Sequence, residues 1–118
     1  MATLTVEGPE LVVGLSWLEK LGALSGGVRV PLRAVRSASA EPDPWAALRG
    51  IRAPGTGIPG VIAYGTRRYS GGRDFAAVLD HRPAVRVDLG EGSPFARLVV
   101  SVSDADGTAA AIRGAAGI

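Results

Sequence analysis

The sequence lacks cysteine, asparagine and glutamine altogether, and it contains a single lysine, Lys20, and a single histidine, His81. Without cysteine, disulfides, thiolate zinc sites and cysteine nucleophiles are excluded. No apolar run reaches the roughly 18 residues of a membrane-spanning helix, and the amino terminus has neither the basic nor the apolar region of a secretion signal. We therefore expect a soluble, cytoplasmic protein.

The excess of one charge sign is also small. The chain has 13 basic and 11 acidic residues, so its formal net charge is +2. So small a surplus does not create a strong positive field. A surface that binds nucleic acid usually interleaves aromatic with basic side chains, whereas aromatic residues make up only 5% of this chain. The composition therefore argues against nucleic acid as a partner.

Glycine and proline, by contrast, are abundant, with 17 and 8 residues among 118. This content is typical of many turns and short elements and excludes a helical bundle. Hydrophobic residues make up 47%, which argues against disorder. A chain of this length holds one core, so we predict a single domain over residues 1–118.

Alternating apolar residues predict a mainly β fold. Two apolar runs, 2–6 and 10–15, flank Gly8 and Pro9 and predict a hairpin. A third strand over 28–32 changes its apolar phase before Val35, which indicates a bulge or break near Pro31. The runs 61–69, 73–81, 82–90 and 95–103 follow one another with short turns and predict an antiparallel meander.

Two helices carry clear signals. Ser16 and Glu19 form a capping box before an apolar stripe, which predicts a short helix over about residues 17–24. Ser103 and Asp106 resemble a second capping box. The residues after it place small and apolar side chains on one helical stripe, namely Ala105, Ala109, Ile112 and Ala116. We expect this C-terminal helix to pack closely against the sheets.

The connection over residues 40–60 is the longest in the predicted fold and contains a short helical piece at Trp45–Leu48. Its glycines Gly55, Gly57 and Gly60 spell GxGxxG, with Asp80 twenty residues after Gly60. A dinucleotide fingerprint needs a strand before the glycines and a helix starting within them. Prolines interrupt this segment instead, so we interpret it as a structural loop. The two tryptophans, Trp17 and Trp45, are interpreted as plugs that complete a small core.

Catalytic residues are hard to find. A Ser–His–Asp relay would have to use His81, but no nucleophile motif is present and His81 lies in a predicted turn beside Pro83. Asp104 and Asp106 are better explained as charges at a helix N-terminus than as metal ligands. We therefore expect no enzyme, no cofactor and no metal site.

The most prominent basic group surrounds the turn at residues 70–72. Arg67, Arg68 and Arg73 flank this turn, and Arg49 and Arg52 lie in the 40–60 connection. If they faced one side, these five arginines could bind a phosphate, a lipid head group or an acidic partner. The alternative is a solvated end of a hairpin.

Several segments in combination resemble a known family. They are EKLGAL at 19–24, GGVRVPLRAV at 26–35, PGTGIPG at 54–60 with Gly65-Thr66 after it, AVRVDL at 84–89 and RLVVSVSD at 97–104. Over nearly its whole length the chain is similar to bacterial pleckstrin-homology-like (PH-like) domains, specifically the small soluble kind of high-GC bacteria. The resemblance implies an α+β fold of about seven strands. Its two nearly orthogonal antiparallel sheets would bend into a partly open barrel that the C-terminal helix closes.

The resemblance also bears on function. Phosphoinositide-binding relatives carry basic residues in the loop between the first two strands, but here that loop is Glu7-Gly8-Pro9-Glu10. The C-terminal helix offers alanines where many relatives have a tryptophan. Both differences favour protein binding or self-association over membrane targeting. We therefore expect a non-enzymatic binding or scaffold module acting through sheet edges, the 40–60 connection or the arginine-bearing hairpin. The alternative is an anionic-ligand or membrane-surface module that uses the five arginines.

Overall fold

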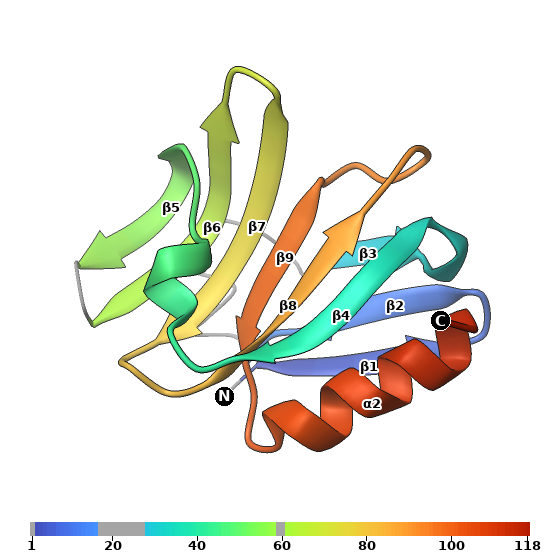
Figure 1. Cartoon of the computed structure of the whole chain (residues 1–118). Coiled ribbons are helices and arrows are strands. Elements are labelled where there is room, and N and C mark those ends of the chain that lie inside the picture. The colour runs from blue at the N-terminus through green and yellow to red at the C-terminus, as the bar shows by residue number, and fades with distance from the viewer. Residues whose placement is uncertain (1, 17–27, 59–60) are drawn as a thin grey trace.

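The computed structural model describes residues 2–16, 28–58 and 61–118 and contains two sheets and a C-terminal helix (Figure 1). The first sheet has the order β1-β2-β3, with β1 (Thr3–Glu7), β2 (Glu10–Gly14) and β3 (Val28–Pro31). The second has the order β4-β8-β9-β7-β6-β5. Its strands are β4 (Val35–Glu41), β5 (Ile51–Ile58), β6 (Ile62–Tyr69), β7 (Gly72–Leu79), β8 (Ala84–Leu89) and β9 (Arg97–Ser101).

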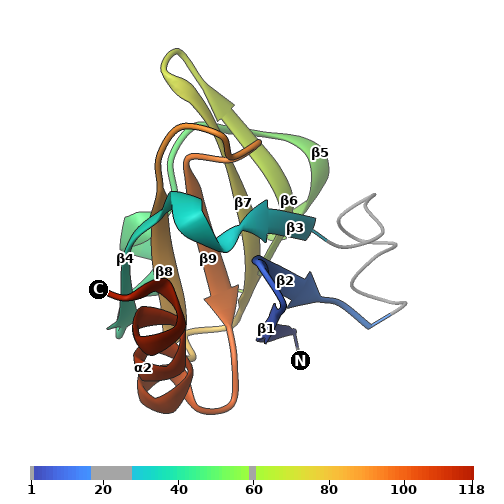
Figure 2. The same cartoon turned by 90° about the vertical axis from the view of Figure 1, so that its right-hand side faces the viewer.

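The main core lies between the two sheets and is closed along one side by α2 (Ala105–Ala116) (Figure 2). Its largest fully buried side chains include Phe75, Leu11, Leu98 and Ile112. The prediction of a mainly β protein with a C-terminal helix is thereby confirmed. No strand pairing between the two sheets is found in the described part of the chain, so they do not form a closed barrel.

The predicted N-terminal hairpin is confirmed as β1 and β2. Glu7 lies opposite Glu10, so only Gly8 and Pro9 form the turn. Gly8 has φ +59°, the left-handed conformation that a two-residue hairpin turn of type II′ requires at its first position. In such a hairpin the residues flanking the turn are hydrogen-bonded to each other, and bonded pairs alternate along the strands. Thr3, Thr5 and Glu7 therefore direct their backbone groups to β2, and Leu4 and Val6 direct theirs outward.

The predicted break near Pro31 is also confirmed. Strand β3 ends at Pro31, and a 3-10 turn, η1 (Leu32–Ala34), leads directly into β4 in the other sheet. The Leu32 amide donates to the Pro9 carbonyl at 2.8 Å, which holds this crossing against the β1–β2 turn. Proline suits the position because it ends the ladder and supplies no N–H.

The predicted antiparallel meander is wrong in one respect. Strand β9 inserts between β7 and β8, pairing parallel with β7 and antiparallel with β8. Side-chain alternation specifies which face a residue takes, but not which strand lies beside it. Leu98, Val99 and Val100 are all fully buried. A central strand covered on both faces provides that environment, and a strand at the edge does not.

The 40–60 connection is also different from the expected loop. It contains a 3-10 helix, η2 (Pro44–Ala47), and strand β5, so Gly55 and Gly57 belong to a strand. The rejection of a nucleotide fingerprint stands, because β5 pairs with β6 and leads to no helix. Trp45 packs on a second small core on the outer face of the six-stranded sheet, and its Nε1 donates to the Asp80 carbonyl at 2.9 Å. Trp45 therefore serves as the predicted plug, whereas Trp17 lies outside the described residues.

The C-terminal helix forms where it was predicted, but its N-cap is Asp104 and not Ser103. The Asp104 carboxylate accepts from the Gly107 amide at 3.0 Å. Aspartate is one of the best N-cap residues. Ala109 and Ile112 are each 1% exposed, as the predicted stripe requires. The helix contacts β4 and β8 of one sheet and β1 of the other. The helix predicted over 17–24 lies outside the described residues, and the finer assignment to a PH-like fold stays a prediction.

Candidate functional site

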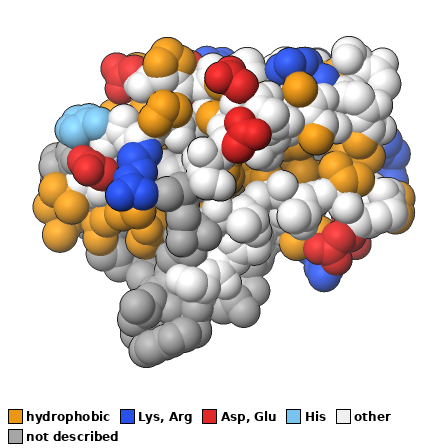
Figure 3. Space-filling model, turned by 90° about the horizontal axis from the view of Figure 1, so that it is seen from below, with side chains coloured by type: hydrophobic (Ala, Val, Ile, Leu, Met, Phe, Trp, Pro, Cys, Tyr) orange, Lys and Arg blue, Asp and Glu red, His pale blue; other side chains and the backbone are white. Residues whose placement is uncertain are grey.

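An open groove of about 560 Å³ lies between β1 and α2. Seen from below, it is a hollow that contains hydrophobic side chains (Figure 3). It is lined by Leu4, Thr5, Val6, Asp104, Gly107, Thr108, Ala111, Ile112 and Ala115. The groove exists because α2 covers the opening between the two sheets with mostly small side chains, which do not fill the space beside β1.

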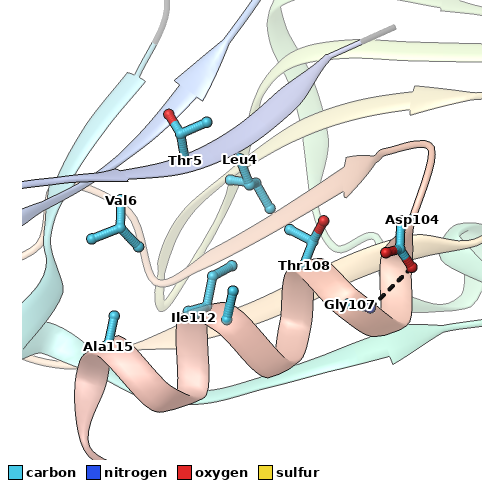
Figure 4. Close-up of a pocket in the computed structure, with 9 residues that line it drawn as sticks. Leu4, Thr5, Val6, Asp104, Gly107, Thr108, Ile112 and Ala115 are labelled. Atoms are coloured by element: carbon cyan, nitrogen blue, oxygen red, sulfur yellow. Dashed lines mark hydrogen bonds between the residues drawn. The ribbon is translucent and has the colours of Figure 1, made fainter.

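The walls of the groove follow from the periodicity of its two elements. Leu4 and Val6 point toward α2, and Thr5, between them, points away (Figure 4), as alternation along a strand requires. Leu4 is buried, but Val6 is 39% exposed, one of the most exposed large hydrophobic residues described. Apolar surface at the site is therefore incompletely covered.

The β1 side of the groove also offers backbone groups. Strand β1 lies at the edge of its sheet and pairs only with β2 among the described strands. The hairpin geometry directs the amides and carbonyls of Leu4 and Val6 to the outer edge of β1. Free edges of this kind are templates for another strand. An apolar hollow and an unpaired strand edge thus meet at Leu4–Val6.

One end of the groove is polar. Asp104 is the one charged side chain among the described residues that line it, and Thr108 follows one helical turn later. At the other end, Ala115 also borders a second hollow of about 310 Å³, lined by Pro9, Leu32, Arg33, Ala115 and Ala116. The groove therefore runs along most of α2, with an acidic end at the helix N-terminus.

The five arginines singled out from the sequence do not all lie on one face of the six-stranded sheet. Arg67 and Arg68 are neighbours in β6, so their side chains point to opposite faces. Arg67 lies opposite Asp74 on the outer face, and Arg68 lies opposite Arg73 on the other. Arg52 is in β5, where its backbone pairs with Arg67. The hairpin thus does not bring the five guanidinium groups together on one side.

Three of these arginines donate to the protein's own oxygen atoms. Arg49 forms a bidentate pair with Asp74, with both N–O distances 2.8 Å, and it stacks over the Tyr69 ring. Arg67 donates to the carbonyls of Arg49 and Gly50, both at 3.1 Å. These contacts fasten the segment between η2 and β5 onto the β6–β7 hairpin.

Arg73 donates to the Pro94 carbonyl at 2.8 Å and lies over the Phe95 ring. It thereby ties the β6–β7 turn to the segment that leads into β9. The side chains of Arg49, Arg67 and Arg73 are therefore parts of the scaffold. This arrangement follows from long-range strand pairing, which the spacing of the arginines in the sequence does not reveal.

A row of charged residues crosses the outer face of the six-stranded sheet. Arg67, Asp74, Arg97 and Asp88 lie opposite one another on four successive strands. Arg97 Nε donates to Asp88 at 2.7 Å and Arg86 Nε donates at 3.0 Å. Burial alone raises the pKa of Asp88, but the hydrogen bond and charge of Arg97, followed by the charge of Arg86, bring the pKa below its usual value. The alternating signs leave these buried and half-buried charges compensated.

The other residues considered for chemistry lie apart from both hollows. His81 is exposed in the turn between β7 and β8 and lines neither of them. Within residues 2–16, 28–58 and 61–118, no three acidic or histidine side chains are grouped so that they could hold a metal ion. No helix in the same ranges is long and apolar enough to cross a membrane.

The sequence contains a weak signal for the groove, which the predictions above do not include. The face of α2 that carries Gly107, Ala111 and Ala115 is small and uncharged, although it is exposed. Exposed helix faces in globular proteins are usually polar. The signal is incomplete without β1, which lies about a hundred residues earlier in the chain. Comparison with protein-family models, with curated proteins and with solved structures finds no match to this chain.

Proposed function

We propose that this protein is a non-enzymatic binding module that accepts an extended segment of a partner protein along β1. The segment adds to the three-stranded sheet as a fourth strand, and its side chains enter the groove beside α2. The observation that supports this proposal is the coincidence of the free edge of β1 with the groove. Strand addition of this kind takes its affinity from backbone hydrogen bonds and its specificity from pockets for alternate side chains.

The small side chains of α2 give the partner room. A strand added to β1 lies about 4.8 Å from it, over the hollow and facing the helix. Ala111 and Ala115 project only a methyl group, so aliphatic side chains of the partner fit between the strand and the helix. Burying them removes apolar surface from water, at about 25 cal/mol per Å², including the exposed part of Val6.

The contacts of the arginines favour the groove over the anionic-ligand alternative. Arg49, Arg67 and Arg73 already donate to protein oxygens, and binding an anion would compete with those bonds. Sedimentation with vesicles containing phosphatidylglycerol checks this choice. We expect no salt-sensitive binding; binding that weakens with salt and with Arg68→Ala would favour the alternative. Membership of the PH-like family stays a prediction, and the proposal does not depend on it.

A display library of linear peptides, selected on the purified full chain, tests the proposed function. Selected peptides are synthesised and titrated into isotope-labelled protein. We expect amide shifts concentrated in β1 and α2. Ala111→Glu should weaken binding by tenfold or more, because the longer charged side chain enters the groove.

Ala110→Glu is the matched control. It makes the same change at an exposed position of the same helix that does not line the groove, and it should leave the affinity unchanged. The proposal is wrong if no peptide is enriched, if the shifts map elsewhere, or if both glutamate variants weaken binding equally.

A further inference from the structure

The polar end of the groove restricts which segment fits, and this inference rests on the proposed function. The groove is apolar at Leu4, Val6 and Ile112, whereas Asp104 and Thr108 lie together where α2 begins (Figure 4). Asp104 Oδ1 accepts from the Gly107 amide. An ionised carboxylate can accept several hydrogen bonds, so Asp104 can receive a cationic donor while it caps the helix.

The spacing of the α2 positions matches that of a strand. Thr108, Ala111 and Ala115 follow one another at three and four residues, or about 4.5 and 6 Å along the helix axis, and Asp104 lies one turn before Thr108. Alternate side chains of an extended chain are about 6.6 Å apart. Three alternate side chains of a bound strand therefore face three successive positions of the helix.

The charges at the far side of β1 do not interfere with this pattern. Thr5 points away from α2 (Figure 4), and Glu7 shares that strand face because residues two apart point the same way. Glu7 also pairs with Arg29. Asp106 is exposed in the first turn of α2 but does not line the groove. Asp104 is thus the acidic group that a bound segment meets.

From this arrangement we propose that the partner segment presents three side chains to the groove, each two residues from the next. The one at one end is a lysine or arginine, and the other two are aliphatic. The cation lies at Asp104 and Thr108. The aliphatic side chains lie against Ala111 and Ala115, between the helix and the side chains of Leu4 and Val6.

Two synthetic peptides test both chain directions, acetyl-Lys-Thr-Val-Thr-Val-amide and acetyl-Val-Thr-Val-Thr-Lys-amide. Each is compared with an analogue in which norleucine, uncharged but of similar length, replaces lysine. Affinities are measured by amide shifts of the labelled protein at low salt. We expect one direction to bind with about a threefold or larger advantage for lysine, the size of a modest ion pair.

Asp104→Asn provides the decisive variant, because asparagine caps a helix as well as aspartate does and removes only the charge. It should abolish the advantage of lysine over norleucine. Asp106→Asn, with the same change two residues away outside the groove, should preserve it. The inference is overturned if lysine gives no advantage, or if its advantage survives in Asp104→Asn.

The same experiments separate this inference from the proposed function. If library peptides bind the groove but the alternating peptides do not, or bind without regard to lysine, the module binds peptides and the proposed pattern is wrong. If neither kind of peptide shifts the amides of β1 and α2, both proposals fail.

Discussion

Asp74 is the residue on which the outer face of the six-stranded sheet depends most directly. Only 2% of it is exposed. It accepts two bonds from Arg49 and one, at 2.9 Å, from the Tyr69 hydroxyl. A buried carboxylate is tolerable only when it is paired and hydrogen-bonded in this way. Arg49 therefore stabilises a buried acid, although its grouping with the other arginines suggested a ligand site.

Removing the acid should be costly. We expect Asp74→Ala to lower the free energy of unfolding by about 2–4 kcal/mol, because Arg49 and the Tyr69 hydroxyl lose a shared acceptor. Tyr69→Phe removes one bond of the same group and should cost about 1 kcal/mol. Urea denaturation measures both. Equal effects of the two variants would show that the Arg49 pair contributes little.

The lowered pKa of Asp88 leads to a separate prediction, that the stability of the fold depends on pH. Because the hydrogen bonds and charges of Arg97 and Arg86 hold the pKa of Asp88 in the folded chain below its ordinary value of 3.8, ionised Asp88 stabilises the fold above that pH. The contribution is lost as the pH falls through the folded-state pKa. Asp88→Asn should therefore be less stable than the wild type at neutral pH, and the difference should shrink below about pH 3.8. Urea titrations of both proteins across pH 2–7 measure it; a difference independent of pH would contradict the assignment.

At the scale of elements, the hairpin register gives adjacent residues of β1 different hydrogen-bonding directions. Thr5 directs its amide to β2, whereas the amide of Val6 faces the outer edge. Proline has no N–H and is accepted in a strand only where the amide is not needed. Thr5→Pro should thus lower the free energy of unfolding by about 2 kcal/mol through the lost ladder bond.

Val6→Pro should cost distinctly less than Thr5→Pro, yet it should abolish binding of selected peptides, because it blocks the edge that a partner strand needs. Urea denaturation and the peptide titration together check this pair. If Val6→Pro is the more destabilising of the two, the register is opposite to the one inferred, and Leu4 and Val6 do not present the free edge.

At the scale of the whole molecule, α2 joins two sheets that share no strand pairing in the described residues. Ile112 lies 1% exposed between them. We expect Ile112→Ala to cost about 2–5 kcal/mol and to speed amide exchange in both β1 and β4. The exposed Ala110→Glu variant is the control and should leave exchange in both strands unchanged. An effect confined to one sheet would contradict the bridging role of the helix.

The sequence predicted the features that local signals govern. The Gly8-Pro9 turn, the break at Pro31 and the apolar stripe with Ala109 and Ile112 each depend on residues a few positions apart. The placement of β9, the strand at 51–58 and the groove depend on contacts between distant segments. Alternation alone does not encode those contacts, and Arg67 and Arg68 show the consequence, because adjacent cations in a strand face opposite ways.

The position of β9 has a consequence for how the chain acquires its structure during synthesis. Strands β7 and β8 are made before it, but β9 lies between them and separates them in the finished sheet. Until residues 97–101 leave the ribosome, β4 with β8 and β5 through β7 are two fragments with unpaired edges. The six-stranded sheet is therefore completed only after its five other strands have been made, and α2 follows directly after the strand that completes it. A chain that stalls before this point exposes strand edges prone to aggregation.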